Sequence, residues 1–379
     1  MAPRETLQIL ISSGDASGDM YAARLAAALR QRTGAQIFGM GGQRMREAGV
    51  ELIVDAKEIA VLGITEVIHK IPAVLKILSR LRKEAVRRKP GLAIVVDSPG
   101  TNLPLGKKLH RLDVPVVYFI APQIWAWRPW RIRAMKRILD RVLVIFPFEA
   151  AIYEKAGIPV DFVGHPLVDV VRPSKTRAEF LAAHGLDAAR PVIALLPGSR
   201  PSEISLNLPD MLDGCENLAR DLNPQFIMAV APGIPDPFFQ RYMRPGLNIR
   251  RIAGEPYDVL ASADCAIVSS GTATVEAALL GTPMVVVYRV TPTSAFILRR
   301  MIRTPHIAMV NLIAERRVVP ELIQSDFTGA RVDTEVRKIL GSDEERGRMK
   351  RDLAEVAARL GSGGAIDRAA DILAGMLQK

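Results

Sequence analysis

The sequence predicts an α/β protein built from two doubly wound, Rossmann-like domains, and three observations support this prediction. The chain has 379 residues, which is too long for one ordinary hydrophobic core. Short runs rich in Ile and Val alternate with helical stretches along the whole chain, as in βαβ units. Several runs, such as "AIVV" and "VLVIF", are continuously apolar, which is typical of parallel strands buried on both faces.

Each strand is expected where one of these apolar runs occurs. In the first domain, residues 1–170, the predicted strands are 7–12, 36–40, 92–97, 114–120, 142–146 and 160–163. In the second domain, residues 171–345, they are 192–196, 226–230, 248–252, 265–269 and 284–288. The stretch "HPLVDVVRPSKTRAEF", rich in proline and charge, is expected to link the domains. Because ligands of open parallel sheets bind beyond the carboxyl ends of the strands, we expect the functional residues in strand-to-helix turns, with the domains facing across a cleft.

The composition is typical of a globular protein, and its charge distribution limits the classes of partner to consider. Hydrophobic residues make up 49% of the chain and its formal net charge is +11. Residues 1–170 contain 25 Lys and Arg against 16 Asp and Glu, whereas the remainder contains 26 against 24. A basic first half can meet nucleic acid, an anionic membrane or a phosphorylated substrate, and the count alone does not choose among them.

The sequence also carries information on the compartment. No apolar run reaches the roughly 18–20 residues needed to cross a bilayer. The N-terminus lacks the long apolar region and cleavage site of an export signal. Cys215 and Cys265 have no metal or redox spacing, so we expect reduced thiols in the core. We therefore expect a cytoplasmic protein.

Two turns of the second domain are suited to a nucleotide diphosphate. In "VIALLPGSRPSEI", residues 192–204, Arg200 stands beside Glu203 at the start of a helix and can balance a diphosphate. The alternative is a capped turn with a surface arginine. In "AIVSSGTATVEAALLGTPMVVV", residues 266–287, small residues let phosphates approach the first helical N–H groups, and Glu276 can accept hydrogen bonds from ribose. The alternative is a Ser-capped helix. The residues assigned to this second turn are Ser270, Gly271, Thr272, Ala273 and Glu276.

A third stretch of the second domain, "VNLIAERRVVPELIQ", covers residues 310–324. It carries Asn311 and Glu321 as candidate polar contacts near the same pocket. The alternative for each is an ordinary surface residue. Two phosphate-suited turns in one domain favour a nucleotide-diphosphate pocket more than either turn does alone.

The first strand of the first domain runs into "SGDASGD", a glycine-rich turn with two carboxylates. Carboxylates repel a phosphate, which argues against a phosphate-binding turn, while the glycines permit a tight turn and close approach of a ligand. Asp19 has an equal alternative, which is to cap the first helix. The residues assigned to this loop are Ser13, Gly14, Asp15, Ser17, Gly18 and Asp19.

Asp97 is the candidate catalytic residue, because it ends the buried run "LAIVVD" at the ligand-binding edge of the sheet. Desolvation there can raise the pKa of a carboxyl group into the range of a general base. The alternative is a cap for the turn "DSPG". The stretch "APQIWAWRPWRI" suits either nucleic-acid bases or a membrane interface. Further candidate site residues are Gln123, Trp125, Arg128 and His165, the last with a structural hydrogen-bonding role as its alternative.

Residues 71–89 predict an amphipathic helix with a basic face. The apolar stripe is expected to hold Ile71, Val74, Leu75, Leu78, Leu81 and Ala85. The opposite stripe holds Lys76, Arg80, Lys83 and Arg87. A buried face with a solvated basic back explains this pattern. The preceding apolar segment "IAVLGITEVIHKIP" adds a second interpretation, in which the region rests on anionic lipid.

Taken together, these stretches closely resemble the lipid-A-disaccharide synthase family of GT-B-fold glycosyltransferases. The resemblance covers roughly residues 7–325, and its opening loop and Trp-Ala-Trp-Arg stretch are specific to the family. The matching pieces are "SGDASGD", "GMGGQRM", "VLGITEV", "DSP", "APQIWAWRPWRI", "FPFE", "VGHPL", "LPGSRPSEI", "SSGTATVEAAL" and "NLIAERRVVPELIQ".

The resemblance implies the reaction and its partners. UDP-2,3-diacylglucosamine would donate its sugar to the 6-hydroxyl of 2,3-diacylglucosamine 1-phosphate, giving a β(1→6) tetraacyl disaccharide 1-phosphate and UDP. Asp97 would be the base, and Arg200 with the turn around Ser270 would hold the donor. The opening loop would grip sugar hydroxyls on the acceptor side, together with Gln123, Trp125, Arg128 and His165. No cofactor or metal is implied, and no Asp-x-Asp motif occurs. The basic first domain would rest on the anionic cytoplasmic face of the inner membrane, as a peripheral protein of a Gram-negative cell. Residues 346–379 would form C-terminal helices that can cross back to the first domain.

Some features depart from the family pattern, and other classes remain as alternatives. Gly100 and Thr101 stand where the family usually has Asp and Phe, and Asp15 where it often has Glu. Acyl-chain length and oligomeric state stay open. Another UDP-sugar GT-B transferase or epimerase is the nearest alternative. A nucleic-acid-binding protein fits only the basic charge, and a nicotinamide dehydrogenase lacks its G-x-G-x-x-G turn after the first strand.

Overall fold

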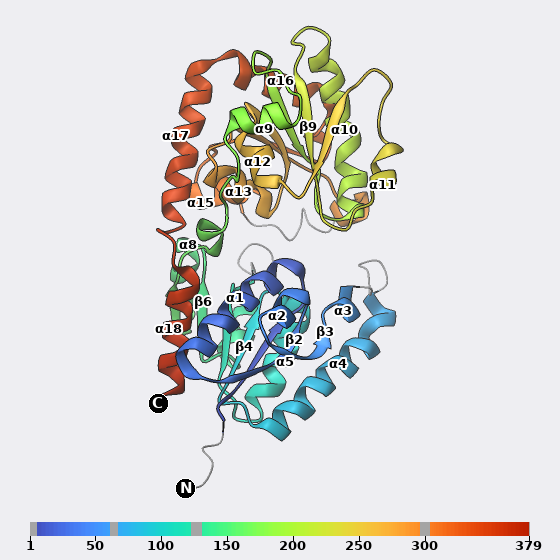
Figure 1. Cartoon of the computed structure of the whole chain (residues 1–379). Helices are drawn as coiled ribbons and strands as arrows, with labels where there is room; N and C mark the ends of the chain where they lie inside the picture. The colour runs from blue at the N-terminus through green and yellow to red at the C-terminus, as the bar shows by residue number, and fades with distance from the viewer. Residues whose placement is uncertain (1–5, 61–66, 123–130, 296–303, 379) are drawn as a thin grey trace. The chain divides into compact units, whose positions relative to one another are not determined.

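The computed structural model describes residues 6–60, 67–122, 131–295 and 304–378 (Figure 1). The chain divides into two compact units, of which the first comprises Met1–Pro166 and Gly361–Lys379 and the second Leu167–Leu360. Each unit has one parallel sheet with helices packed on it, which confirms the predicted pair of Rossmann-like α/β folds. Cys215 and Cys265 are both buried, and burial raises the pKa of both thiols.

The first unit contains a seven-stranded sheet in the order β3-β2-β1-β4-β5-β6-β7, with every neighbouring pair parallel. The order reverses direction between β1 and β4, which is where open α/β sheets bind ligands. The strands are β1 (Gln8–Ser13), β2 (Gln36–Gly41), β3 (Glu51–Asp55), β4 (Leu92–Val96), β5 (Val116–Phe119), β6 (Arg141–Val144) and β7 (Val160–Phe162). The helices are α1 (Ala16–Thr33), α2 (Gln43–Glu47), α3 (Lys57–Ala60), α4 (Val67–Arg88), α5 (Pro99–His110), α7 (Ile132–Lys136), α8 (Pro147–Lys155), the 3-10 turn η3 (Pro166–Asp169) at the unit boundary, and α18 (Ala365–Leu377).

The second unit contains a six-stranded parallel sheet in the order β10-β9-β8-β11-β12-β13, reversing between β8 and β11. The strands are β8 (Val192–Leu196), β9 (Gln225–Val230), β10 (Ile249–Ala253), β11 (Cys265–Ser269), β12 (Met284–Tyr288) and β13 (Glu321–Ile323). The helices are α9 (Arg177–Ala183), α10 (Pro201–Ala219), α11 (Asp236–Gln240), α12 (Pro256–Ala261), α13 (Thr272–Leu279), α15 (Met309–Ala314), η4 (Gln324–Asp326), α16 (Gly329–Gly341) and α17 (Asp343–Arg359).

The C-terminal helices belong to different units, which differs from the single C-terminal segment 346–379 expected from the sequence. Helix α17 stays with the second unit, because it buries Met349, Leu353 and Val356 and packs on α13 and α15. Only α18 joins the first unit, where it packs on α1. Arg32 of α1 also forms ion pairs of 2.9 and 2.6 Å with the carboxylates of Asp367 and Asp371 on α18.

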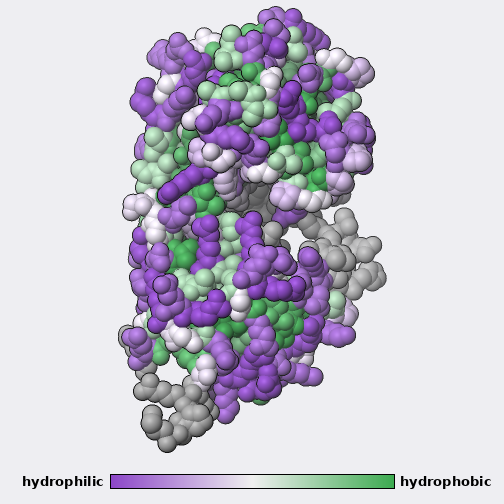
Figure 2. Space-filling view, in the orientation of Figure 1, coloured by the Kyte–Doolittle hydropathy of each residue, from purple (hydrophilic) through white to green (hydrophobic). Residues whose placement is uncertain are grey.

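The amphipathic helix is present as α4, but its buried face is shifted from the predicted stripe. Leu75 is 52% exposed, whereas Ile77 is buried with Leu78, Leu81 and Ala85. The prediction that Leu75 faces the core is therefore wrong. The helix turns Leu75 to the same exposed side as its basic residues, and Ile71 lies among the residues whose side chains are not described. Figure 2 shows a mainly hydrophilic surface on the first unit in this view, with hydrophobic residues in small groups. Among the helices of the described ranges, none is long and apolar enough to cross a membrane.

Candidate active site

The opening loop, residues 13–19, follows β1 and contacts the turn after β4 in the first unit. Asp15 is the N-cap of α1, and its Oδ1 accepts a 2.7 Å hydrogen bond from the Gly18 N–H. Its Oδ2 accepts a 2.6 Å hydrogen bond from the hydroxyl of Ser98, in the turn after β4. A Cβ atom at Gly14 would lie 3.0 Å from the same hydroxyl oxygen, so the loop packs closely on the β4 turn. Ser17, in the first turn of α1, is exposed.

Asp19 is buried and forms hydrogen bonds with the backbone at the start of α2. It is 6% exposed, and its carboxylate accepts hydrogen bonds from the backbone N–H groups of Gly42, Arg44 and Met45, at 2.6, 3.0 and 3.3 Å. Asp19 therefore caps α2, whereas α1 is capped by Asp15, so the alternative role of Asp19 as the cap of α1 is wrong.

Asp97 directly follows β4 in a strained backbone conformation. Both Asp97 and Ser98 have φ of +46°, in the left-handed region that costs roughly 1–2 kcal/mol for a non-glycine residue. The main-chain oxygen of Asp97 accepts hydrogen bonds from the Tyr118 hydroxyl at 2.6 Å and the Asn102 amide at 2.9 Å. Strain that is held by buried donors at the ligand-binding edge of a sheet points to a functional residue.

His165 follows β7 and is 4% exposed. Its ring packs against Phe146 and Tyr21, with centroid distances of 5.3 and 6.4 Å. Burial lowers the pKa of His165 to about 3, so the imidazole is neutral at physiological pH. The remaining acceptor-side candidates, Gln123, Trp125 and Arg128, lie outside the described residues.

In the second unit, Arg200 and Glu203 form a pair at the start of α10. Arg200 is the N-cap residue, and its guanidinium lies 2.9 Å from Glu203 Oε1. Glu203 Oε2 accepts a 3.1 Å hydrogen bond from the Ser199 N–H. The arginine side chain is 62% exposed, so this contact orients a guanidinium that remains open to solvent. Gly198 has φ of +130°, and a Cβ atom there would lie 2.8 Å from the Cβ of Glu203.

The turn after β11 leaves its backbone accessible. Gly271 is the N-cap of α13, and Gly271 and Thr272 are exposed, while Ala273 is half-buried. The Ser270 hydroxyl lies 3.4 Å from the carbonyl oxygen of Ile307. The first N–H groups of α13 are thus presented at the carboxyl edge of the sheet, as an anion-binding turn requires.

Glu276 lies one turn further into α13 and is half-buried. Burial raises the pKa of its carboxyl group to about 7. A carboxyl group with this pKa changes protonation state near neutral pH, which makes its hydrogen bonds to a ligand sensitive to pH.

The polar side-chain atoms of Asn311 and Glu321 form hydrogen bonds within the second unit. Asn311 is fully buried, and its Oδ1 accepts hydrogen bonds from the N–H groups of Val318 and Val319 at 2.8 and 3.0 Å. Its Nδ2 donates to Glu321 Oε1 at 2.7 Å. The Glu321 carboxylate also accepts hydrogen bonds from the N–H groups of Ile307 and Ala308, both at 3.1 Å. These contacts hold the segment around α15 and fix the positions of both side chains.

Sequence reasoning missed two buried asparagines that organise the carboxyl edges of the sheets. The Asn102 side chain of α5 forms hydrogen bonds with Ser12 near the end of β1 and with Val96 at the end of β4. Asn207 of α10 donates to the Pro197 carbonyl and the Ser269 hydroxyl, after β8 and at the end of β11, and accepts from the Arg289 N–H after β12. A single Asn in a helix has no spacing signal of its own, so the sequence alone assigns no role to either residue.

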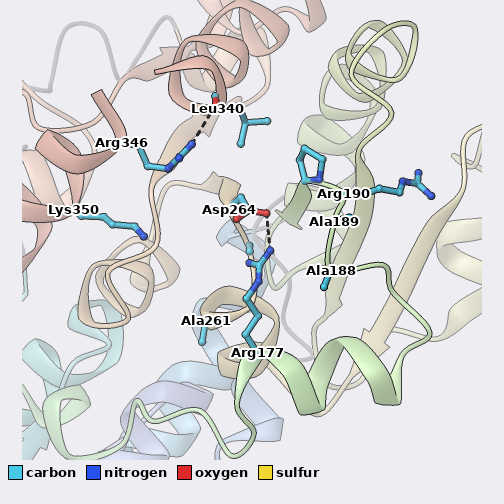
Figure 3. Close-up of a pocket in the computed structure, with 11 residues that line it drawn as sticks. Arg177, Ala188, Ala189, Arg190, Ala261, Asp264, Leu340, Arg346 and Lys350 are labelled. Atoms are coloured by element: carbon cyan, nitrogen blue, oxygen red, sulfur yellow. Dashed lines mark hydrogen bonds and ion pairs between the residues drawn. The ribbon is translucent and has the colours of Figure 1, made fainter. Parts of the chain in front are cut away.

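A cavity of about 570 Å³ in the second unit is lined by residues of α9, α12, α16 and α17 and of the segments before β8 and β11 (Figure 3). Its lining includes Pro191 and Asp264, which precede β8 and β11, so it opens at the amino edge of the sheet. Arg177 spans it to reach Asp264, with an N···O distance of 2.9 Å. This cavity is therefore separate from the candidate active-site turns. Among the residues that the structure describes, no cluster of His, Cys, Asp and Glu is suited to a metal ion.

The two parallel-sheet units give the chain the GT-B fold, which solved glycosyltransferases share. The chain shares its fold with the calicheamicin glycosyltransferase CalG4, with a TM-score of 0.64 and 17% identity over 99% of each chain. It also shares the fold of MnaA of S. aureus, solved with UDP, with a TM-score of 0.70 and 12% identity over 98% of this chain and 97% of that one.

Within this class, the chain belongs to the lipid-A-disaccharide synthetase family, which matches residues 9–369. It is 46% identical to the lipid-A-disaccharide synthase of Acidobacterium capsulatum, over 98% of this chain and 96% of that protein. It is 42% identical to the enzyme of the same name from Geobacter sulfurreducens, over the full length of both. The protein is thus a glycosyltransferase of lipid A biosynthesis, and the epimerase and nucleic-acid alternatives are not favoured.

Proposed function

We propose that the protein transfers 2,3-diacylglucosamine from UDP-2,3-diacylglucosamine to the 6-hydroxyl of 2,3-diacylglucosamine 1-phosphate. The products are a β(1→6)-linked tetraacyl disaccharide 1-phosphate and UDP. The observation that carries this proposal is Asp97, a carboxylate held in a strained turn at the ligand-binding edge of a chain of this family.

On the acceptor side, Asp97 acts as the general base. Its carboxylate takes the proton of the 6-hydroxyl while the hydroxyl oxygen forms a bond to the anomeric carbon of the donor. The bond from that carbon to the β-phosphate oxygen breaks on the opposite face, and its electron pair leaves with UDP. One displacement converts the α-linked sugar into a β-linked product. The hydrogen bond from the Ser98 hydroxyl to Asp15 supports the opening loop on this side.

On the donor side, positive groups stabilise the departing diphosphate. Arg200 provides a guanidinium at the mouth of α10, oriented by Glu203. The N–H groups after Gly271 provide further donors. Glu276 accepts hydrogen bonds from the ribose hydroxyls. These assignments rest on accessible donors at one sheet edge and on the half-buried carboxyl group one helical turn away.

The reaction is tested by incubating the chain with both acylated glucosamines and following UDP and the disaccharide by mass spectrometry. We expect equal amounts of the two products, and neither when the acceptor is left out. Release of UDP at the same rate without acceptor would show a hydrolase and contradict the proposal.

The role of Glu276 predicts a pH dependence of UDP affinity. Its ionised form can accept two ribose hydroxyls, and this form is lost as the pH falls through about 7. We expect the Kd for UDP, measured by calorimetry, to rise severalfold between about pH 8 and about pH 6. In Glu276→Gln the Kd should be higher at pH 8 and depend less on pH. Because ionisation of UDP itself affects both proteins equally, identical pH dependence in the two would refute the assignment.

We further propose that the protein rests peripherally on the anionic cytoplasmic face of the inner membrane. The exposed side of α4 carries Lys76 and Lys83 together with Leu75 and Val86, which are 52% and 50% exposed. Basic side chains beside exposed apolar ones suit an anionic lipid surface.

Flotation with anionic liposomes tests this membrane proposal. We expect co-flotation at low salt that weakens at high salt, and a clear loss in the double variant Lys76→Glu/Lys83→Glu. Lys350→Glu, on an exposed position of α17, is the control for a charge change elsewhere. Failure of the wild-type chain to float at low salt, or equal flotation of all variants, would argue against it.

A further inference from the structure

The carboxyl end of β4 is held by one fully buried amide, that of Asn102 in the first turn of α5. Its Oδ1 accepts a 2.7 Å hydrogen bond from the Ser12 hydroxyl. Its Nδ2 lies 3.2, 2.8 and 2.9 Å from the main-chain oxygens of Ser12, Val96 and Asp97. One side chain therefore connects the last residues of β1 with the last residues of β4.

The hydrogen-bond network defines the orientation of this amide. Three carbonyl oxygens surround Nδ2, and a reversed amide would place Oδ1 against all three. The two hydrogens of Nδ2 are shared among three acceptors, so a side chain without donors at this position would lose all three contacts.

The same amide controls the residue that the proposed mechanism uses as base. Asp97 and Ser98 both have φ of +46°, and the hydrogen bonds around them stabilise this conformation. Asn102 and Tyr118 both donate to the Asp97 carbonyl oxygen, which fixes the peptide plane between Asp97 and Ser98. Since that plane and the αL conformation set the direction of the Cα–Cβ bond, they also set where the carboxylate points.

We infer that Asn102 is a positioning residue for the transfer reaction. It holds the carboxylate of Asp97 in line with the acceptor hydroxyl, and it couples the β4 turn to the opening loop through Ser12. This inference rests on the proposed function, because that function makes Asp97 the base. A displacement of about 1 Å in such a group is expected to cost about 100-fold in rate.

The second unit offers a matched control in Asn207. It is also fully buried, and its Nδ2 donates to the Pro197 carbonyl at 3.0 Å, while its Oδ1 accepts the Arg289 N–H at 3.0 Å. It organises the edge assigned to the donor. The same chemical change at Asn207 should therefore impair UDP binding, whereas at Asn102 it should spare UDP binding.

The experiment compares Asn102→Asp with Asn207→Asp in the full chain. Each substitution replaces an NH₂ group that faces buried acceptors by an oxygen at nearly constant volume. For Asn102→Asp we expect kcat to fall about 30- to 100-fold, the calorimetric Kd for UDP to stay within about twofold, and the acid limb of the kcat–pH profile to move. For Asn207→Asp we expect the Kd for UDP to rise at least about tenfold.

Three outcomes would overturn the inference. The first is Asn102→Asp with kcat within about threefold of wild type. The second is an Asn102→Asp variant that loses kcat and UDP affinity to the same extent with an unmoved pH profile, as a merely structural role would produce. The third is turnover by Asp97→Asn, assayed in parallel. This last outcome also contradicts the proposed base, whereas the first two leave it intact.

If Asn102→Asp does not fold, Ser12→Ala decides the question. It removes the hydroxyl donor to Asn102 Oδ1 and leaves the three carbonyl contacts in place. We expect kcat to fall about three- to tenfold with the UDP Kd unchanged. An unchanged kcat in this variant would overturn the inference.

Discussion

Asp97→Asn is expected to lower kcat about 1,000-fold while UDP binds with wild-type affinity. The variant keeps the shape of the side chain and, because Asn tolerates the left-handed region as Asp does, it keeps the φ of +46°. It removes only the ability to take a proton, which contributes roughly 10²- to 10⁴-fold in general-base catalysis. Steady-state rates with both substrates, together with calorimetry for UDP, measure the two effects separately.

Asp113→Asn is the matched control for this prediction. Asp113 also has a left-handed backbone, with φ of +57°, but it is exposed and precedes β5 at the amino edge of the sheet. It should retain wild-type turnover. Near-normal turnover by Asp97→Asn would remove Asp97 from the mechanism. Loss of UDP affinity in that variant would instead indicate a wider structural change.

Arg200→Ala is expected to lower kcat/KM about 10²- to 10³-fold. The guanidinium is the cation assigned to the departing diphosphate, and removing one such preorganised donor costs this much in comparable sites. Arg200→Lys should recover part of the loss, since it restores the charge without the planar fork of donors. The unfolding temperature should change little, because the side chain is 62% exposed and its ion pair with Glu203 is worth at most about 1 kcal/mol.

The control for Arg200 lies at the other end of the same helix. Arg220 is the exposed C-cap residue of α10, and Arg220→Ala should leave kcat/KM unchanged. If Arg200→Ala and Arg220→Ala have the same kinetics, the donor assignment fails. If Arg200→Ala lowers the unfolding temperature markedly, its kinetic effect would reflect the fold of the turn.

The fold was predictable from the sequence because buried parallel strands form continuous apolar runs. β4 and β8, buried along their whole length, follow the predicted ranges closely. The edge strands β3 and β13 were missed, because they are short and carry charged residues at their ends. The predicted stripe of α4 included Leu75, since spacing alone does not define which of several apolar positions meets the sheet.

A candidate site residue could be predicted from the sequence where its residue type has few common roles at that position in the fold. A carboxylate at the end of a buried strand drew attention to Asp97, and the structure adds the strained turn that holds it. Asn311 and Glu321 suggested ligand contacts by their polarity, yet they bond to each other and to nearby backbone. Asn102 and Asn207 gave no signal, because their partners lie up to 90 positions away in the sequence.

The central claim is a single inverting displacement onto the 6-hydroxyl of the acceptor. It is tested most directly by NMR of the disaccharide that the wild-type chain forms from UDP-2,3-diacylglucosamine and 2,3-diacylglucosamine 1-phosphate. We predict a β-configured anomeric carbon linked to position 6, with one UDP released per disaccharide. An α-linkage, a linkage to another hydroxyl, or free 2,3-diacylglucosamine in place of the disaccharide would contradict it.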